Sequence, residues 1–216
     1  METDMENYAL FYGNLSYSHS EQAKTLIPQF STIIKKFTSE NYMFPDYDQS
    51  LTEVGLLKRN LTPEILLEDN HRHLAQDEDL FSYLREATDQ LGFNKEVFDK
   101  IEPVLVKVIN PLALQLKAYW NRARPYQYAY EGDIDFHPLS TVSGNTPSYP
   151  SGHTMQTETW GLIMKSNYPD LTETIDIIVA DINQSRLNMG IHFPSDIKFS
   201  KNIIDFLWSH NLINKQ

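Results

Sequence analysis

The sequence of 216 residues contains no cysteine. This absence excludes disulfide frameworks, thiolate nucleophiles and thiolate metal ligands. The sequence also lacks any uninterrupted apolar run of about 18 residues, the length that indicates a membrane-spanning helix. The N-terminal segment METDMENYALFYGNLSYSHSEQ opens acidic and has no apolar core of signal-peptide length. We therefore expect a soluble, cytoplasmic protein that does not associate with membranes.

Positive charge is scarce. Lysine and arginine together number 18 against 29 aspartate and glutamate residues, which gives a formal net charge of -11. Proteins that bind nucleic acid or anionic membranes usually present a broad basic face. Nucleic acid is therefore not an expected partner, and any anionic ligand must be bound by a local cluster of cations.

Strand-like alternation is almost absent, whereas the spacing typical of amphipathic helices recurs along most of the chain. One long segment, 125 to 152, is instead rich in Pro, Gly, Ser, Tyr and Asp, and loops of this length are often functional. The pattern predicts an all-α, single-domain helical bundle over residues 1 to 216, with this loop across one end. The predicted helices are 20–39, 63–73, 77–92, 94–121, 153–167, 170–188 and 195–210.

Two cations occur in the segment LKAYWNRARPY. Lys117 and Arg124 are seven residues apart, which brings them within about 20° of one another on a helix. Pro125 forces Arg124 out of the helix or makes it the last helical residue, so the guanidinium is expected to face the loop. Taken alone, such a pair is more often a solvated helix face.

The segment SYPSGHT precedes a predicted helix. Ser151 is a suitable N-cap, and Gly152 allows close approach to the backbone. The first amides of a helix have no intrahelical partners and, with the helix dipole, favour a bound anion. His153 could donate a proton to a group that leaves this anion. A capped helix with a half-buried histidine explains the segment equally well.

The segment SRLNMGIHFPSDI supplies Arg186, His192 and Asp196. Pro194 suits the first turn of a new helix, so Asp196 can accept a hydrogen bond from one imidazole nitrogen of His192. That bond would fix the tautomer and leave the other nitrogen as a nucleophile. A histidine four residues before an aspartate is weak evidence by itself.

The three segments together carry the pattern Lys-x6-Arg-Pro, Pro-Ser-Gly-His and Ser-Arg-x5-His-x3-Asp. In this pattern the chain resembles the type 2 phosphatidic acid phosphatase and vanadium haloperoxidase superfamily over about residues 107 to 205. LKAYWNRARPY and SYPSGHT are most similar to the bacterial class A non-specific acid phosphatases.

The resemblance implies a metal-independent phosphatase that hydrolyses small soluble phosphate esters and needs no cofactor. It implies that His192 attacks phosphorus, that Asp196 orients His192, and that His153 protonates the leaving group. The residues implied to bind the substrate phosphate are Lys117, Arg124, Ser151, Gly152 and Arg186.

Other functions remain open at this point. In the haloperoxidases of the superfamily, vanadate is bound in the phosphate position, so a vanadium-dependent haloperoxidase is one alternative. A phosphatase specific for nucleotides or pyrophosphate is another, and a phosphate-binding module without turnover is a third. The membrane lipid phosphatases need spanning helices, which the sequence does not predict. The oligomeric state is open between a monomer and a homo-oligomer.

Two further clusters contain residue types that bind metals. Histidines two residues apart on a helix diverge by about 200°, so the first cluster is interpreted as a solvated helix end. The second lies in the long loop and is interpreted as the rim of the pocket, and the tyrosines near it as loop packing or an aromatic wall for a substrate ring. The first cluster is His71 and His73 with Asp69, Asp77, Glu78 and Asp79; the second is Asp133, Asp135 and His137; and the tyrosines are Tyr126, Tyr128 and Tyr130.

Overall fold

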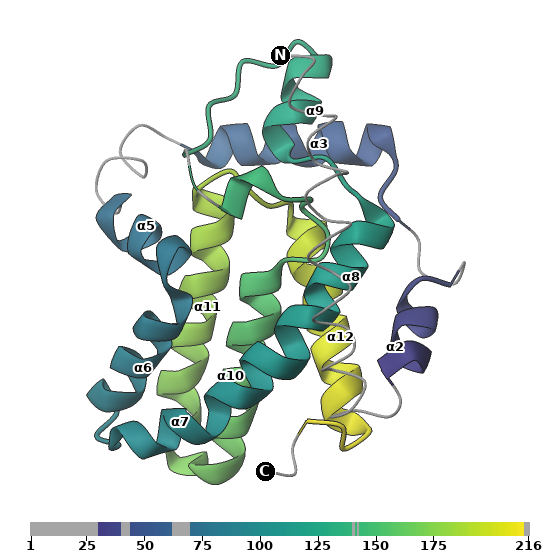
Figure 1. Ribbon diagram of the computed structural model, residues 1–216. Coiled ribbons are helices and arrows are strands. Elements are labelled where there is room, and N and C mark those ends of the chain that lie inside the picture. Colours follow the sequence, from purple (N-terminus) through teal and green to yellow (C-terminus); the bar gives the residue numbers. More distant parts are fainter. Residues whose placement is uncertain (1–29, 40–43, 62–69, 140, 142, 214–216) are drawn as a thin grey trace.

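The computed structural model describes residues 30–39, 44–61, 70–139, 141 and 143–213 (Figure 1). These residues form helices and no strand, so the prediction of an all-α fold is confirmed. The helices near the start of the chain are α2 (Phe30–Phe37), α3 (Tyr47–Asn60), α5 (Asn70–Glu78) and α6 (Leu80–Gln90).

The middle of the chain forms one long rod, which the sequence predicts as a single helix over 94–121. It consists of α7 (Lys95–Val104), a π-helical turn (Leu105–Ile109) and α8 (Asn110–Trp120). Prolines inside a helix remove a backbone donor and crowd the preceding turn. Pro103 and Pro111 lie on either side of the π-helical turn, so they account for the local change in hydrogen bonding.

Three helices complete the bundle: α10 (Gly152–Asn167), α11 (Thr172–Asn188) and α12 (Pro194–Ser209). Helix α10 lies between the others, and its Trp160 is fully buried and donates to Thr88 Oγ1 at 3.1 Å. A side chain at Gly161 would approach Val179 Cγ2 to 2.6 Å, so the glycine permits close contact between α10 and α11. The core between these helices fixes where their ends meet.

Two helices lie across the upper end of the bundle in Figure 1, and the sequence analysis predicted neither. Helix α3 was not recognised at all, and α9 (Pro125–Glu131) lies inside the segment predicted to be a loop. Pro125 is the first residue of α9, where its missing N–H costs nothing and its fixed φ suits a helix. The proline therefore starts a helix, whereas the prediction used it only to end one.

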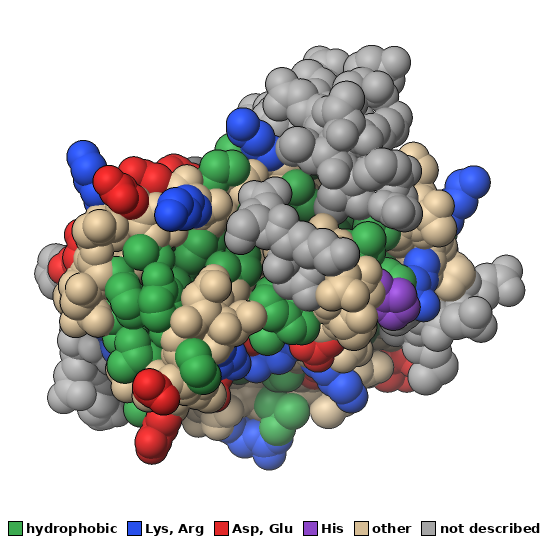
Figure 2. Space-filling view, turned by 90° about the horizontal axis from the view of Figure 1, so that it is seen from below, with side chains coloured by type: hydrophobic (Ala, Val, Ile, Leu, Met, Phe, Trp, Pro, Cys, Tyr) green, Lys and Arg blue, Asp and Glu red, His purple; other side chains and the backbone are tan. Residues whose placement is uncertain are grey.

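The predicted helices 20–39 and 63–73 extend partly outside the described residues, within which α2 ends at Phe37 and α5 begins at Asn70. Figure 2 shows the lower end of the bundle, where hydrophobic side chains gather in one patch among acidic and basic ones. Among the described residues, the helices are all too short or too polar to cross a bilayer.

Candidate active site

The three sequence segments meet at the upper end of the bundle, beneath α3 and α9 (Figure 1). This is the end at which α8 and α11 finish and α10 and α12 begin. The ends of four helices thus bring together side chains that are up to 79 positions apart in the sequence, from Lys117 to Asp196.

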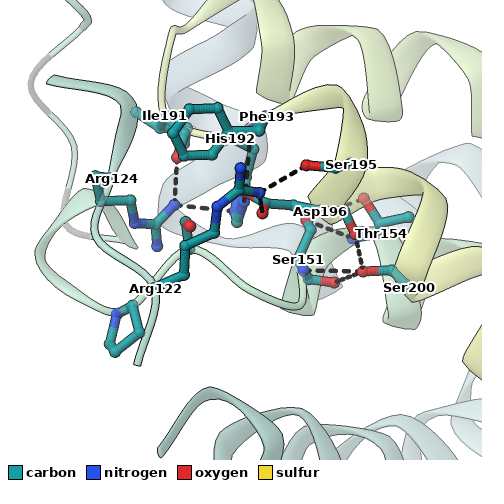
Figure 3. A network of polar contacts seen from close by, with 12 residues as sticks. Arg122, Arg124, Ser151, Thr154, Ile191, His192, Phe193, Ser195, Asp196 and Ser200 are labelled. Carbon is teal, nitrogen blue, oxygen red and sulfur yellow. Dashed lines mark hydrogen bonds and ion pairs between the residues drawn. The ribbon is translucent and has the colours of Figure 1, made fainter. Parts of the chain in front are cut away.

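His192 and Asp196 form the hydrogen bond that the sequence predicts (Figure 3). Nδ1 of His192 lies 3.0 Å from Oδ2 of Asp196, and the Phe193 amide donates to the same oxygen at 2.9 Å. Pro194 starts α12, so Asp196 lies in the first turn and its carboxylate reaches back to both groups. Because Nδ1 donates to Asp196, the lone pair of His192 is on Nε2.

Arg124 lies directly against that nitrogen. Its Nη1 donates to the Ile191 carbonyl at 2.6 Å and lies 3.0 Å from Nε2 of His192. Nη2 donates to the Ser143 carbonyl at 2.6 Å, and Nε donates to the Thr146 carbonyl. The candidate nucleophilic nitrogen, Nε2 of His192, is therefore in direct contact with the buried guanidinium of Arg124.

Lys117 also lies near Arg124, but the two residues do not share one helix face as the sequence predicted. Helix α8 ends at Trp120, and Asn121 has a left-handed conformation with φ of 42°, so Lys117 and Arg124 do not lie on one helix. Lys117 is buried and donates through Nζ to the Pro147 carbonyl. Burial and then the charge of Arg124 hold its pKa well below the usual value, which shows how closely the cations are placed.

Arg186, His153 and Asp77 form the other side of the site. Nη1 of Arg186 donates to Oδ1 of Asp77 at 2.9 Å, and Nε2 of His153 lies 4.0 Å from the same oxygen. Ser143 also donates through Oγ to Asp77. The interpretation of residues 71–77 as a solvated helix end is therefore wrong for Asp77 and for His73, which are both buried. The side chain of His71 lies outside the described part of the chain.

Ser151 is the N-cap of α10, as predicted, and its Oγ accepts from the Thr154 amide at 3.3 Å. The Ser151 amide donates to Ser200 Oγ at 2.9 Å, so it is already used within the protein. A Cβ on Gly152 would lie 3.9 Å from Cε of Lys117, which places this glycine beside the cations. All eight predicted site residues thus lie at one end of the bundle.

Burial and the cations set the protonation of both histidines. Burial, followed by the charges of Arg124 and Lys117, lowers the pKa of His192 well below its usual value. Burial and Arg186 lower the pKa of His153 to about 3, although Asp77 acts in the opposite direction. Both imidazoles are therefore neutral at pH 7 in this structure.

The other clusters do not join the site. His137 and Asp135 form a 2.8 Å pair whose side chains are 88% and 80% exposed, so they are surface groups. Tyr130 is 74% exposed, and Tyr128 packs edge-on against Phe193 with ring centroids 5.7 Å apart. These contacts favour the interpretation of the tyrosines as loop packing.

Residues 103–203 match the family model described as PAP2 superfamily. These residues make up slightly less than half of the chain, and this region is similar to PAP2 superfamily domains. The match contains every predicted site residue, from Lys117 to Asp196, but it includes neither α3 nor Asp77 of α5. The candidate site therefore includes contacts from residues outside the matched region.

One solved structure that is similar to the chain is a transmembrane PAP2-type phosphatidylglycerolphosphate phosphatase from Bacillus subtilis. It is 18% identical, with 100% of this chain and 99% of that chain covered, and the TM-score is 0.39. No curated protein matches the chain.

Proposed function

We propose that this protein is a metal-independent phosphatase that hydrolyses small soluble phosphate esters through a phosphohistidine intermediate. One observation carries the proposal: a buried imidazole, oriented at Nδ1 by Asp196, presents Nε2 to a cluster of cations. A nucleophile fixed by a hydrogen-bonded orienting group is the general arrangement for covalent catalysis. The PAP2 superfamily match supports the phosphatase activity, and the preference for soluble esters is our proposal.

In the first step, Nε2 of His192 attacks phosphorus while the ester P–O bond breaks. His153 protonates the leaving oxygen, and Asp196 stabilises the positive charge that develops on His192. In the second step, His153 takes a proton from water, the water oxygen attacks phosphorus, and the N–P bond breaks. The products are the alcohol and inorganic phosphate, and His192 returns to its neutral form.

The transferring phosphoryl group spreads negative charge over three oxygens, and fixed cations stabilise it. Lys117, Arg124 and Arg186 are all buried at the site and can supply this charge. Lys117 and Arg124 donate to backbone carbonyls of the segment 143–147 in this structure. Binding of an ester exchanges some of these acceptors for phosphate oxygens, so this segment must shift when substrate binds.

Hydrolysis of p-nitrophenyl phosphate between about pH 4 and 8, in excess chelator, tests the proposal. We expect turnover that persists without metal and is blocked by vanadate, because vanadate has the shape and charge of the phosphate group. Nucleoside monophosphates and pyrophosphate, assayed in parallel, test the narrower alternatives. Absence of hydrolysis of all these substrates would contradict the proposal. Peroxide-dependent halide oxidation with added vanadate would then indicate the haloperoxidase alternative, and phosphate binding without turnover would indicate a binding module.

The replacement Asp77→Asn is expected to move the alkaline limb of the kcat profile to lower pH. His153 must be protonated to act as an acid, and the negative charge of the bound ester raises its pKa from the low value of the unliganded site. Activity then falls as the pH rises through this raised pKa. The charge of Asp77 raises that pKa, and its removal lowers it. The matched control is Asp99→Asn, which removes the exposed partner of Arg85. A limb that stays in place or moves to higher pH would show that Asp77 does not control His153.

We further propose that the protein acts in the cytoplasm on a small-molecule phosphate ester, as a monomer or a homo-oligomer, and binds neither nucleic acid nor membranes, because its net charge is -11 and it has no long apolar run.

A further inference from the structure

A third buried arginine, Arg122, contacts Asp196 through the carboxylate oxygen that does not bond to His192 (Figure 3). Its side chain has no exposed surface and joins two carboxylates on different helices. Nη1 donates to Oδ1 of Asp196 at 2.6 Å, and Nη2 donates to Oε2 of Glu53 at 3.0 Å. Its Cζ lies 3.8 Å from the centre of the Phe193 ring, so the ring covers one face of the planar guanidinium.

Glu53 belongs to α3 and makes further contacts with the start of α12. Its Oε1 accepts from the Ser195 amide at 3.0 Å, and its Oε2 accepts from Ser195 Oγ at 2.6 Å. Ser50, one turn earlier on α3, accepts from Nη2 of Arg122 at 2.9 Å. Helix α3 is therefore joined to the turn of α12 that carries Asp196.

We propose that Arg122 and Glu53 are positioning residues for His192, acting through the carboxylate of Asp196. The inference rests on the proposed function of His192 as the nucleophile. Arg122 holds Oδ1 of Asp196, so the other oxygen is directed at Nδ1 of His192. A planar guanidinium can bridge two carboxylates in this way, whereas the single ammonium of a lysine cannot hold the same fork geometry.

Glu53 adds a charge effect to this geometry. Without Glu53, the positive charge of Arg122 would weaken the attraction of ionised Asp196 for the positive charge that forms on His192 during attack. Glu53 offsets the charge of Arg122, so Asp196 keeps its negative charge for His192. This matters because the other charged groups that face His192, namely Arg124, Lys117, Arg186 and protonated His153, all disfavour its cationic form.

Burial raises the pKa of Asp196 above its usual value, and Arg122, the Phe193 amide and Arg124 oppose this rise. A buried carboxylate without such partners tends to take up a proton and lose its charge. Arg122 thus acts against protonation of Asp196, and a protonated Asp196 would be a poor acceptor for the Nδ1 hydrogen of His192.

Two variants test the inference. Arg122→Lys keeps the charge but removes the fork, and Glu53→Gln keeps the shape but removes the charge. A matched control is Arg85→Lys, because Arg85 also joins two carboxylates, Asp99 at 2.5 Å and Glu102 at 2.9 Å, over a phenylalanine ring. That arginine lies on α6 and its two carboxylate partners lie on α7, and neither helix carries a site residue.

We expect Arg122→Lys and Glu53→Gln each to lower kcat by about 10- to 100-fold, as loss of an orienting partner does behind metal-bound histidines. KM should change little, because Lys117, Arg124 and Arg186 are untouched, and Arg85→Lys should behave as the wild type. The second readout is the proton NMR signal of the His192 Nδ1–H, which is shifted far downfield when it is bonded to a buried carboxylate. We expect it to move upfield or disappear in both variants.

A loss that appears in KM with an unchanged Nδ1–H signal would overturn the inference and indicate a structural role. Wild-type kcat together with a wild-type signal in Glu53→Gln would also overturn it. If Arg122→Lys does not fold, Glu53→Gln decides alone. If the wild type shows no turnover, the proposed function fails, and the Nδ1–H signal still tests whether these residues position His192.

Discussion

Replacement of His192 by alanine is expected to reduce kcat by a factor on the order of 10⁵ to 10⁶, as removal of a nucleophile that acts as part of a unit does in other hydrolases. The side chain supplies the atom that forms the bond to phosphorus, and the neighbouring cations cannot replace that bond. The measurement is kcat with p-nitrophenyl phosphate, together with labelling by a substrate that carries ³²P, quenched by denaturation at alkaline pH. The wild type should form an acid-labile phosphoenzyme, and the variant should form none.

The matched control is His210→Ala, which removes the exposed histidine at the C-cap of α12, the helix that begins two residues after His192. Wild-type kcat in this control would show that the loss of kcat is specific to the removal of His192. Labelling of the His192→Ala protein, or kcat within tenfold of the wild type, would show that another residue attacks phosphorus.

Replacement of His153 by alanine is expected to act according to the leaving group. Proton transfer by a positioned acid contributes about 10² to 10⁴ to a rate, and an alkyl phosphate needs that proton because an alkoxide leaves poorly. A nitrophenolate leaves without a proton, so the loss with p-nitrophenyl phosphate should be much smaller. The comparison is kcat for the two substrates in the same variant.

His137→Ala is the control for this second prediction, because His137 is an exposed histidine of the 132–139 segment. It should lose no activity with either substrate. Equal losses for the alkyl and the aryl ester in His153→Ala would contradict the assignment of His153 as the acid.

The parts of the site that depend on local sequence were predictable. Asp196 reaches His192 because Pro194 places it in the first turn of a helix, and both the proline and the spacing are visible in the sequence. Ser151 acts as an N-cap for the same kind of reason. These interactions join residues within four positions of each other, so helix geometry alone determines them.

The parts that depend on tertiary packing were missed. Asp77 meets Arg186 across 109 positions, and Glu53 meets Arg122 across 69. A carboxylate on a polar helix is usually solvated, and nothing in the spacing around Asp77 distinguishes it from such a residue. One usable signal was Arg122, the first arginine of NRARP, since two arginines so close to a bundle end must each find a partner if buried.

The ion pairs of two buried arginines, Arg122 and Arg186, also limit how the chain can be divided. The family match begins at residue 103, so both carboxylates that it leaves out, Glu53 and Asp77, lie on the other side of that boundary. Loss of one partner from a buried ion pair costs about 3–5 kcal/mol. Two such losses approach the roughly 5–15 kcal/mol that holds an ordinary domain folded. The boundary of the matched region is therefore a boundary of sequence similarity, and we expect the unit that folds to extend at least as far back as α3.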